Sequence, residues 1–142
     1  HDMGAAMQGG VGGHAGVFSN ANDLAKIMQM YLQYGYYGGE RYFRKDIVRE
    51  FTKYQYPKKN RRALGFDKPV FPDQEGGPAS ENTSPLSFGH TGFTGTICWA
   101  DPETQILYIF LSNRVHPDRK NNKLLKMNIR TDIMEIIFDS IE

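Results

Sequence analysis

Two segments rich in β-branched and aromatic residues, joined by a short turn, constrain the fold of this chain more than any other feature. The segments "TICWA" (residues 96–100) and "QILYIFLSN" (residues 105–113) favour strands. Asp101-Pro102-Glu103-Thr104 lies between them and is typical of a turn. The pattern predicts an antiparallel hairpin, and with it a mainly antiparallel sheet.

Helical spacing of apolar residues predicts three helices around this hairpin. The first begins after Ser19 or Asn20, either of which can serve as its N-cap, and stops at Gly35 as its C′ residue. The second is expected over residues 44–53 and the third over residues 123–141. The expected inward positions are Leu24, Ile27, Met28, Tyr31 and Leu32, then Ile47, Val48 and Phe51, and finally Leu125, Ile129, Ile133, Ile136, Ile137 and Ile141. This order predicts an α+β fold in which helices flank the sheet.

The remaining segments read as loops. Residues 1–18 are Gly-rich and are expected to be irregular. Residues 56–85 are expected to form a mobile loop insertion, with a short strand at Arg62–Phe66. The basic run at residues 58–62 within it is interpreted as a solvated loop rather than a nucleic-acid contact.

Composition excludes several classes of function. The 142 residues carry a formal net charge of +1, which gives no reason to expect a nucleic-acid partner. Cys98 is the only cysteine and cannot form an internal disulfide. No apolar run approaches the roughly 18 residues that span a bilayer. The histidines are His1, His14, His90 and His116, and no two have the spacing of a zinc site. We expect no metal and no cofactor.

The Gly-rich segment Gly10–Gly16 contains a G-x-G-x-x-A pattern in front of a helix. A dinucleotide site would need a preceding strand and a βαβ unit, and neither is predicted here. A tight loop packed against neighbouring backbone is the favoured interpretation, and nucleotide binding is the alternative.

The stretch "SFGHTGFTGT" (residues 87–96) places glycines in a predicted strand, where they let another backbone approach. An extended substrate could then add as a further strand. His90 and the hydroxyl of Thr91 could bind it, while the Phe93 amide could face a developing oxyanion. The alternative is a glycine-bearing hairpin with a surface histidine.

The segment "FGHTGFTGTICWADPETQILYIFLSNRVHP" resembles the third conserved motif region of the β-lactamase-like serine hydrolases. These include class C β-lactamases, penicillin-binding DD-peptidases and related esterases, which carry Lys-Thr-Gly or His-Thr-Gly on the edge strand of the active site. "GGVGGHAGVFSNANDLAKIMQMYL" resembles the preceding turn and helix, and "NRVHPDRKNNKLLKMNIRTDI" resembles the C-terminal helix of the subgroup fused to bacterial glycosidases. The resemblance implies catalytic roles for His90 and Thr91. It also implies substrate contacts at Gly92 and at Phe93, whose amide would form half of the oxyanion hole.

One departure from the family pattern stands out. The family's nucleophile lies in Ser-x-x-Lys, and no serine of this chain has a lysine three residues later. Ser87 is a conceivable substitute, but it lacks a general base at a fitting spacing. We therefore expect residues 1–142 to be the C-terminal part of one β-lactamase-like domain whose nucleophile lies upstream, and to be inactive alone.

The whole protein is expected to hydrolyse a β-lactam, a D-amino-acid peptide or an ester through an acyl-enzyme. The expected partners are that substrate, the remainder of the domain, and a second copy bound through an open sheet edge or apolar face. The resemblance implies an exported bacterial protein of the periplasm or cell envelope. The alternative function is a non-catalytic module that binds a peptide or glycan or scaffolds a partner.

Overall fold

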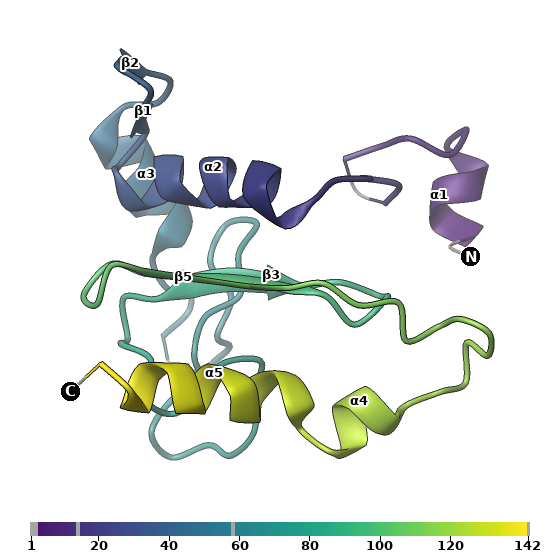
Figure 1. The fold of residues 1–142 in the computed structure, drawn as a ribbon. Coiled ribbons are helices and arrows are strands. Elements are labelled where there is room, and N and C mark those ends of the chain that lie inside the picture. Colours follow the sequence, from purple (N-terminus) through teal and green to yellow (C-terminus); the bar gives the residue numbers. More distant parts are fainter. Residues whose placement is uncertain (1–2, 14, 58, 142) are drawn as a thin grey trace.

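The computed structural model describes residues 3–13, 15–57 and 59–141, and Figure 1 shows a sheet between two helical layers. The three strands are β3 (Phe88–Thr91), β4 (Ile97–Asp101) and β5 (Ile106–Phe110), in the spatial order β3-β4-β5 with antiparallel neighbours. Helix α2 covers one face and helix α5 the other. The predicted α+β class and the hairpin are therefore confirmed.

The register of the hairpin places Asp101 opposite Ile106, so its loop consists of Pro102–Gln105. Each face of the sheet has its own core. Toward α5 the buried side chains are Ile97, Trp99, Tyr108, Met134 and Phe138. Toward α2 they are Met28, Leu32, Phe88 and Ala100. This separation follows from the alternation of side chains along each strand.

The N-terminal region differs from the prediction at its start, because helix α1 (Met3–Met7) forms where irregular chain was expected. Its two alanines favour a helix. The Gly-rich loop that follows is tight, since a Cβ on Gly16 would overlap the carbonyl of Gly10. His14 lies outside the described residues, as does His1.

Helix α2 (Ala21–Leu32) begins as predicted, with Asn20 rather than Ser19 as its N-cap. The Asn20 side chain accepts a hydrogen bond from the backbone N–H of Asp23 at 3.1 Å. The expected stop was one residue off. Gln33 is the C-cap, and Tyr34 takes the left-handed conformation at φ 52° before Gly35. Ile27, an expected inward position, is exposed.

A small hairpin of β1 (Tyr36–Tyr37) and β2 (Glu40–Arg41) turns through Gly38-Gly39 and leads to α3 (Lys45–Thr52). The helix agrees with the expected range of 44–53. Of its three expected inward residues only Val48 is buried, whereas Ile47 and Phe51 are exposed.

The predicted C-terminal helix is two helices, α4 (Lys123–Lys126) and α5 (Ile129–Asp139). They are separated by Asn128, which has a left-handed φ of 53° that a continuous helix cannot include. The expected core stripe was wrong for most of its members. Met134 and Phe138 fill the core instead. The exposed members are Leu125, Ile133, Ile136, Ile137 and Ile141.

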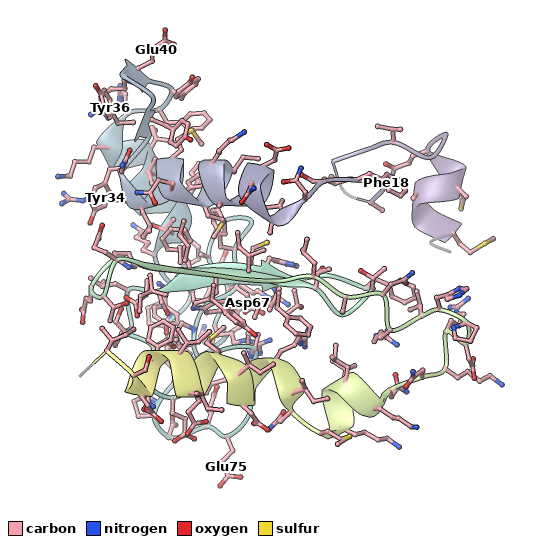
Figure 2. All side chains as sticks on the ribbon, in the orientation of Figure 1. Phe18, Tyr34, Tyr36, Glu40, Asp67 and Glu75 are labelled. Atoms are coloured by element: carbon pink, nitrogen blue, oxygen red, sulfur yellow. The ribbon has the colours of Figure 1, made fainter. Side chains whose placement is uncertain are left out.

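The long segment between α3 and β3 is loop, but it packs into the body of the molecule. The expected strand at Arg62–Phe66 is absent, and only isolated bridges join Arg62 to Asp67 and Asp67 to Gly89. Figure 2 shows Asp67 within the body, in contrast to the exposed Phe18 on the link between α1 and α2. None of the described helices is both long and apolar enough to cross a membrane.

Candidate functional site

Strand β3 is an edge of the sheet, and its outer side is only partly covered. The backbone N–H of Asp67 donates to the Gly89 carbonyl at 2.7 Å, and Gly89 N–H donates back at 3.0 Å. Because backbone direction alternates along a strand, the N–H and C=O of Thr91 point to the same outer side. Among the described residues, no further strand pairs with β3 there. The edge is open from Thr91 onward.

Two glycines shape this strand for steric reasons. A Cβ on Gly89 would overlap the Cys98 carbonyl oxygen and the ring of Trp99 on the neighbouring strand. A Cβ on Gly92 would overlap the Thr96 hydroxyl, which lies across the turn that follows β3. Gly89 thus allows the close approach of β4, and Gly92 allows the close approach of the Thr96 side chain.

Thr91 and Phe93 present unengaged polar groups at the open edge. Within the described part of the chain, neither the Thr91 hydroxyl nor the Phe93 backbone N–H has a hydrogen-bond partner. The Phe93 ring is half-exposed and lies beneath two guanidinium groups, those of Arg114 at 5.3 Å and Arg119 at 6.0 Å. An acceptor oxygen of a ligand could bind the hydroxyl and the amide without displacing a protein partner.

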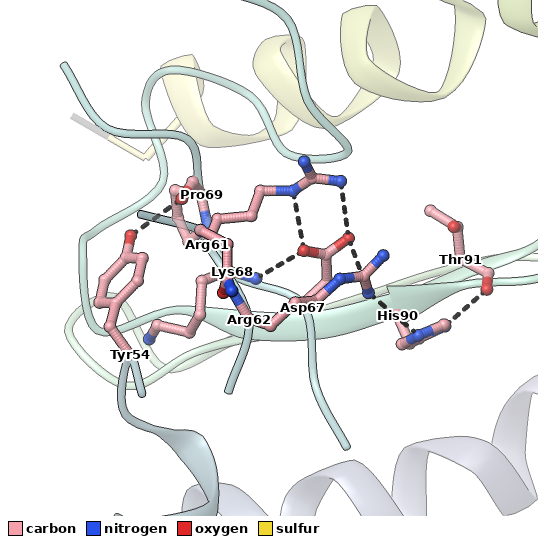
Figure 3. Close-up of polar contacts among 9 residues, drawn as sticks. Tyr54, Arg61, Arg62, Asp67, Lys68, Pro69, His90 and Thr91 are labelled. Carbon is pink, nitrogen blue, oxygen red and sulfur yellow. Dashed lines mark hydrogen bonds and ion pairs between the residues drawn. The ribbon is translucent and has the colours of Figure 1, made fainter. Parts of the chain in front are cut away.

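His90 is held by both of its ring nitrogens (Figure 3). Nδ1 lies 2.7 Å from the Thr91 carbonyl oxygen, and Nε2 lies 3.3 Å from Nη1 of Arg62. Because a guanidinium only donates hydrogen bonds, Nε2 is the acceptor in this contact, and Nδ1 carries the proton that goes to the carbonyl.

Asp67 anchors the arginines, and its side chain is buried. Arg61 spans its carboxylate, with Nε 2.8 Å from Oδ1 and Nη2 3.1 Å from Oδ2. Arg62 Nη1 lies 3.4 Å from Oδ2 (Figure 3). Within the basic run, Arg62 is exposed, as a solvated loop predicts, whereas Arg61 is partly buried; Lys58 lies outside the described residues. The signal in the sequence is "RRALGFD", a tight return that brings Asp67 back beside Arg62.

Lys68 is a second buried charged residue, and no pattern in the sequence indicated its burial. Its Nζ donates to the Leu86 carbonyl at 3.0 Å and lies 4.9 Å from the centre of the Tyr54 ring. Burial lowers the pKa of Lys68 to about 8, against a smaller opposing effect of Asp101. Lys68 lines an open cavity of about 860 Å³ between α3 and the start of β3. This cavity lies at the Phe88 end of β3, whereas His90 lies toward the other end of the strand.

Comparison with known proteins identifies the family to which this chain belongs. The family model described as Beta-lactamase matches residues 1–129, which is most of the chain. The chain belongs to the β-lactamase family of serine hydrolases.

Several proteins from Salmonella are similar to this chain in sequence. Proteins called "Putative D-alanyl-D-alanine carboxypeptidase" from Salmonella enteritidis PT4, Salmonella typhi and Salmonella newport SL254 are each 36% identical to this chain over 122 residues. The aligned region covers 82% of this chain and 26% of each relative. The chain thus spans about a quarter of the length of these relatives.

Two serines of this member of the β-lactamase family, Ser80 and Ser87, have structural partners. Ser87 is fully buried and accepts a hydrogen bond from the indole N–H of Trp99 at 3.0 Å, so its oxygen does not face a substrate. The Ser80 hydroxyl is also buried and accepts a hydrogen bond from the Asn82 backbone N–H, and the Asn82 side chain binds Asp139.

The described residues contain no group of three His, Cys, Asp or Glu side chains arranged to hold a metal ion. His116 lies in an exposed loop. The thiol of Cys98, opposite His90 in the sheet, is partly buried, and burial raises its pKa. The sequence-predicted site residues 90–93 are thus contiguous at one open edge, with Arg62 and Asp67 joined to them from the loop.

Proposed function

We propose that these residues form the edge-strand wall of an acyl-enzyme active site, which hydrolyses a peptide with a D-amino-acid terminus. The observation that carries this proposal is the open end of β3, where the Thr91 hydroxyl and the Phe93 amide lack partners among the described residues. The backbone of Thr91 would pair with an extended substrate as an added strand. The Phe93 amide would donate to the oxyanion of the tetrahedral intermediate.

The substrate class is favoured by the relatives, whose printed name is that of a D-alanyl-D-alanine carboxypeptidase. A β-lactam or an ester uses the same chemistry and is the second choice. Such an enzyme would act on peptides of the cell envelope, so we place the whole protein there. Gly92 keeps the turn after β3 close to Thr96, which holds the Phe93 amide at the end of the strand.

The nucleophile in this proposal comes from outside the 142 residues. No Ser-x-x-Lys occurs among them, and the Ser87 hydroxyl already accepts a hydrogen bond from the Trp99 indole. The relatives are about four times as long as the region they share with this chain. Residues 1–142 would then be one part of a β-lactamase domain, and would be inactive alone because the nucleophile and its base are missing.

Intact-mass spectrometry with a penicillin-type probe tests the proposal. The whole protein is expected to gain one acyl adduct, and the 142-residue chain is expected to gain none. Labelling of the chain alone would contradict the external nucleophile. An unlabelled whole protein that also fails to release D-alanine from a D-alanyl-D-alanine peptide would contradict the acyl-enzyme, and would favour a non-catalytic binding module.

A further inference from the structure

The open cavity of about 860 Å³ between α3 and the start of β3 takes no part in the chemistry proposed for the other end of that strand. Its volume lies within the range of about 300–1,000 Å³ that small-molecule sites occupy. Tyr34, Tyr54 and Phe88 are among its lining residues. Aromatic walls with a few charged groups among them are typical of sites for organic molecules.

Lys68 supplies a buried cation to this cavity, since the residue is 1% exposed. Its ammonium has three N–H donors, and among the described residues the Leu86 carbonyl at 3.0 Å is the one hydrogen-bond acceptor that they reach. The Lys68 side chain lies beside the Tyr54 ring (Figure 3). With a pKa of about 8, Lys68 is mostly charged at pH 7, and no described acid forms an ion pair with it. A buried cation thus keeps two donors that a ligand could use.

Lys45 and Arg49 add two positive charges on the α3 wall of the same cavity. Both contact the ring of Tyr34, with Nζ of Lys45 4.7 Å and the guanidinium carbon of Arg49 5.3 Å from its centre. They are four residues apart on a helix, and like charges at this spacing destabilise it. Within the described part of the chain, neither forms an ion pair with an acid. An anion bound beside them would relieve this repulsion.

The two acids that line the cavity do not compensate these charges. Asp46 forms an ion pair with Arg44, and Glu50 forms one with Lys53 at 2.6 Å. Each acid is therefore matched by a cation other than the three described above. The cavity keeps an excess of positive charge between walls that are partly aromatic.

We propose that this cavity binds an organic anion with an aromatic body, and that Lys68 and the Lys45–Arg49 pair are its anion-binding groups. The anionic group would be a carboxylate or a phosphate, whose oxygens accept charge-assisted hydrogen bonds from ammonium and guanidinium groups. The aromatic side chains of the cavity would pack against the body of the ligand. The site lies at the Phe88 end of β3, away from the edge that opens at Thr91, and the inference does not depend on the acyl-enzyme activity.

Ligand-observed NMR titration of the whole protein tests this with phenyl phosphate, inorganic phosphate and phenol. Phenyl phosphate combines an aromatic ring with an anion, and each of the other probes carries only one of these features. Phenyl phosphate is expected to bind at least tenfold more tightly than either. The titration is repeated after treatment with the penicillin-type probe and is expected to give the same dissociation constant, because acylation would occur at the other end of β3.

Variants of the three cations locate the bound probe. Lys68→Met and Arg49→Gln are each expected to weaken phenyl phosphate binding about tenfold, as for a lost hydrogen bond between charged groups. Arg49→Lys is expected to retain part of the affinity. Lys120→Gln removes a positive charge from an exposed position outside the cavity and is expected to change nothing. Arg49 is exposed, so its variants test the proposal even where Lys68→Met does not fold.

The outcomes separate this site from the proposed function. A whole protein that does not bind phenyl phosphate overturns the inference, and so does binding that survives Arg49→Gln at the wild-type affinity. Phenol or inorganic phosphate that binds as tightly as phenyl phosphate also overturns it, as does binding that acylation abolishes. A protein that is not acylated, yet binds phenyl phosphate through Arg49, would keep this site and lose the proposed function.

Discussion

The hydroxyl of Ser87 and the indole of Trp99 are joined by a 3.0 Å hydrogen bond, and neither side chain is exposed to solvent. This contact joins the entry of β3 to the centre of β4 and lies in the core that faces α5. Ser87 therefore completes the hydrogen bonding of a buried indole. The same contact argues against a catalytic role, because a nucleophile must reach the substrate and a base.

Ser87→Ala is expected to destabilise the protein without removing an acyl adduct. The variant leaves the Trp99 N–H buried without its acceptor, which costs about 1–3 kcal/mol. Urea denaturation measures the loss, and Ser19→Ala, at an exposed position, is the matched control. A folded Ser87→Ala variant of the whole protein that loses the adduct would show that Ser87 is the nucleophile.

Gly89→Ala is expected to lower stability by about 3 kcal/mol, at the upper end for overpacked sites. The new methyl group would overlap backbone and ring atoms of β4, which cannot move independently of the sheet. Gly13→Ala is the control, because a Cβ there meets no atom within 4 Å. Thermal unfolding of both variants checks this, and equal losses would refute the close approach of the two strands.

Thr91→Val is expected to reduce kcat/KM of the whole protein roughly 10- to 100-fold, the range for a lost hydrogen bond to a charged group. The side chain keeps its shape and loses only the hydroxyl, which has no partner among the described residues, so stability should change little. Thr104→Val, in the exposed turn between β4 and β5, is the control. Unchanged kinetics in Thr91→Val would exclude the hydroxyl from substrate binding.

The buried Lys68 is expected to make stability depend on alkaline pH. Its pKa is about 8 in the folded protein and 10.5 in the unfolded chain, so the unfolded chain binds more protons between these values. Stability relative to Lys68→Met should therefore rise from about pH 8 toward pH 10.5, by at most about 3 kcal/mol. The comparison cancels the opposite contributions of Cys98 and Tyr54, whose raised pKa values favour the folded state only at lower pH.

Denaturation at pH 7.5, 8.5 and 9.5 measures this difference between the wild type and Lys68→Met. Lys120→Met, at an exposed position, should show no such trend. A difference that stays constant over the series would mean that Lys68 is solvated in the folded protein.

Local patterns in the sequence predicted the main helices and the central hairpin of the fold. The features that these patterns did not predict depend on tertiary contacts. The β4–β5 hairpin and the Asn20 cap depend on neighbouring residues, so both could be predicted. The exposure of Ile136 could not be predicted, because periodicity finds an apolar stripe without showing which part of it meets the sheet. Met134 occupies that position instead.

The candidate site likewise contains residues that could be predicted from the sequence and contacts that could not. The run His90–Phe93 is contiguous and could be found by its motif. The link between Arg62 and His90 joins residues 28 positions apart, and it depends on the turn that returns the chain at Asp67. No helical or strand period relates such residues, so only the folded structure brings them together.

The last prediction concerns the apolar side of α5. Ile136 is 68% exposed and Ile141 51%, and the outer edge of β5 has no partner strand among the described residues. We propose that another part of the whole protein covers this side, since the relatives continue well beyond the region shared with this chain. Open strand edges and apolar patches are otherwise sites of association.

Ile136→Glu in the whole protein distinguishes a covered from a solvated position. If the remainder of the domain covers Ile136, the buried carboxylate should cost about 2 kcal/mol or more, whereas a solvated position tolerates the change within about 0.5 kcal/mol. Glu135→Gln, on the exposed neighbouring residue, controls for charge on the helix. In the 142-residue chain the same substitution should instead reduce self-association, measured by light scattering. A chain that is monomeric at high concentration, together with a whole protein that tolerates Ile136→Glu, would show that this face is solvated in both.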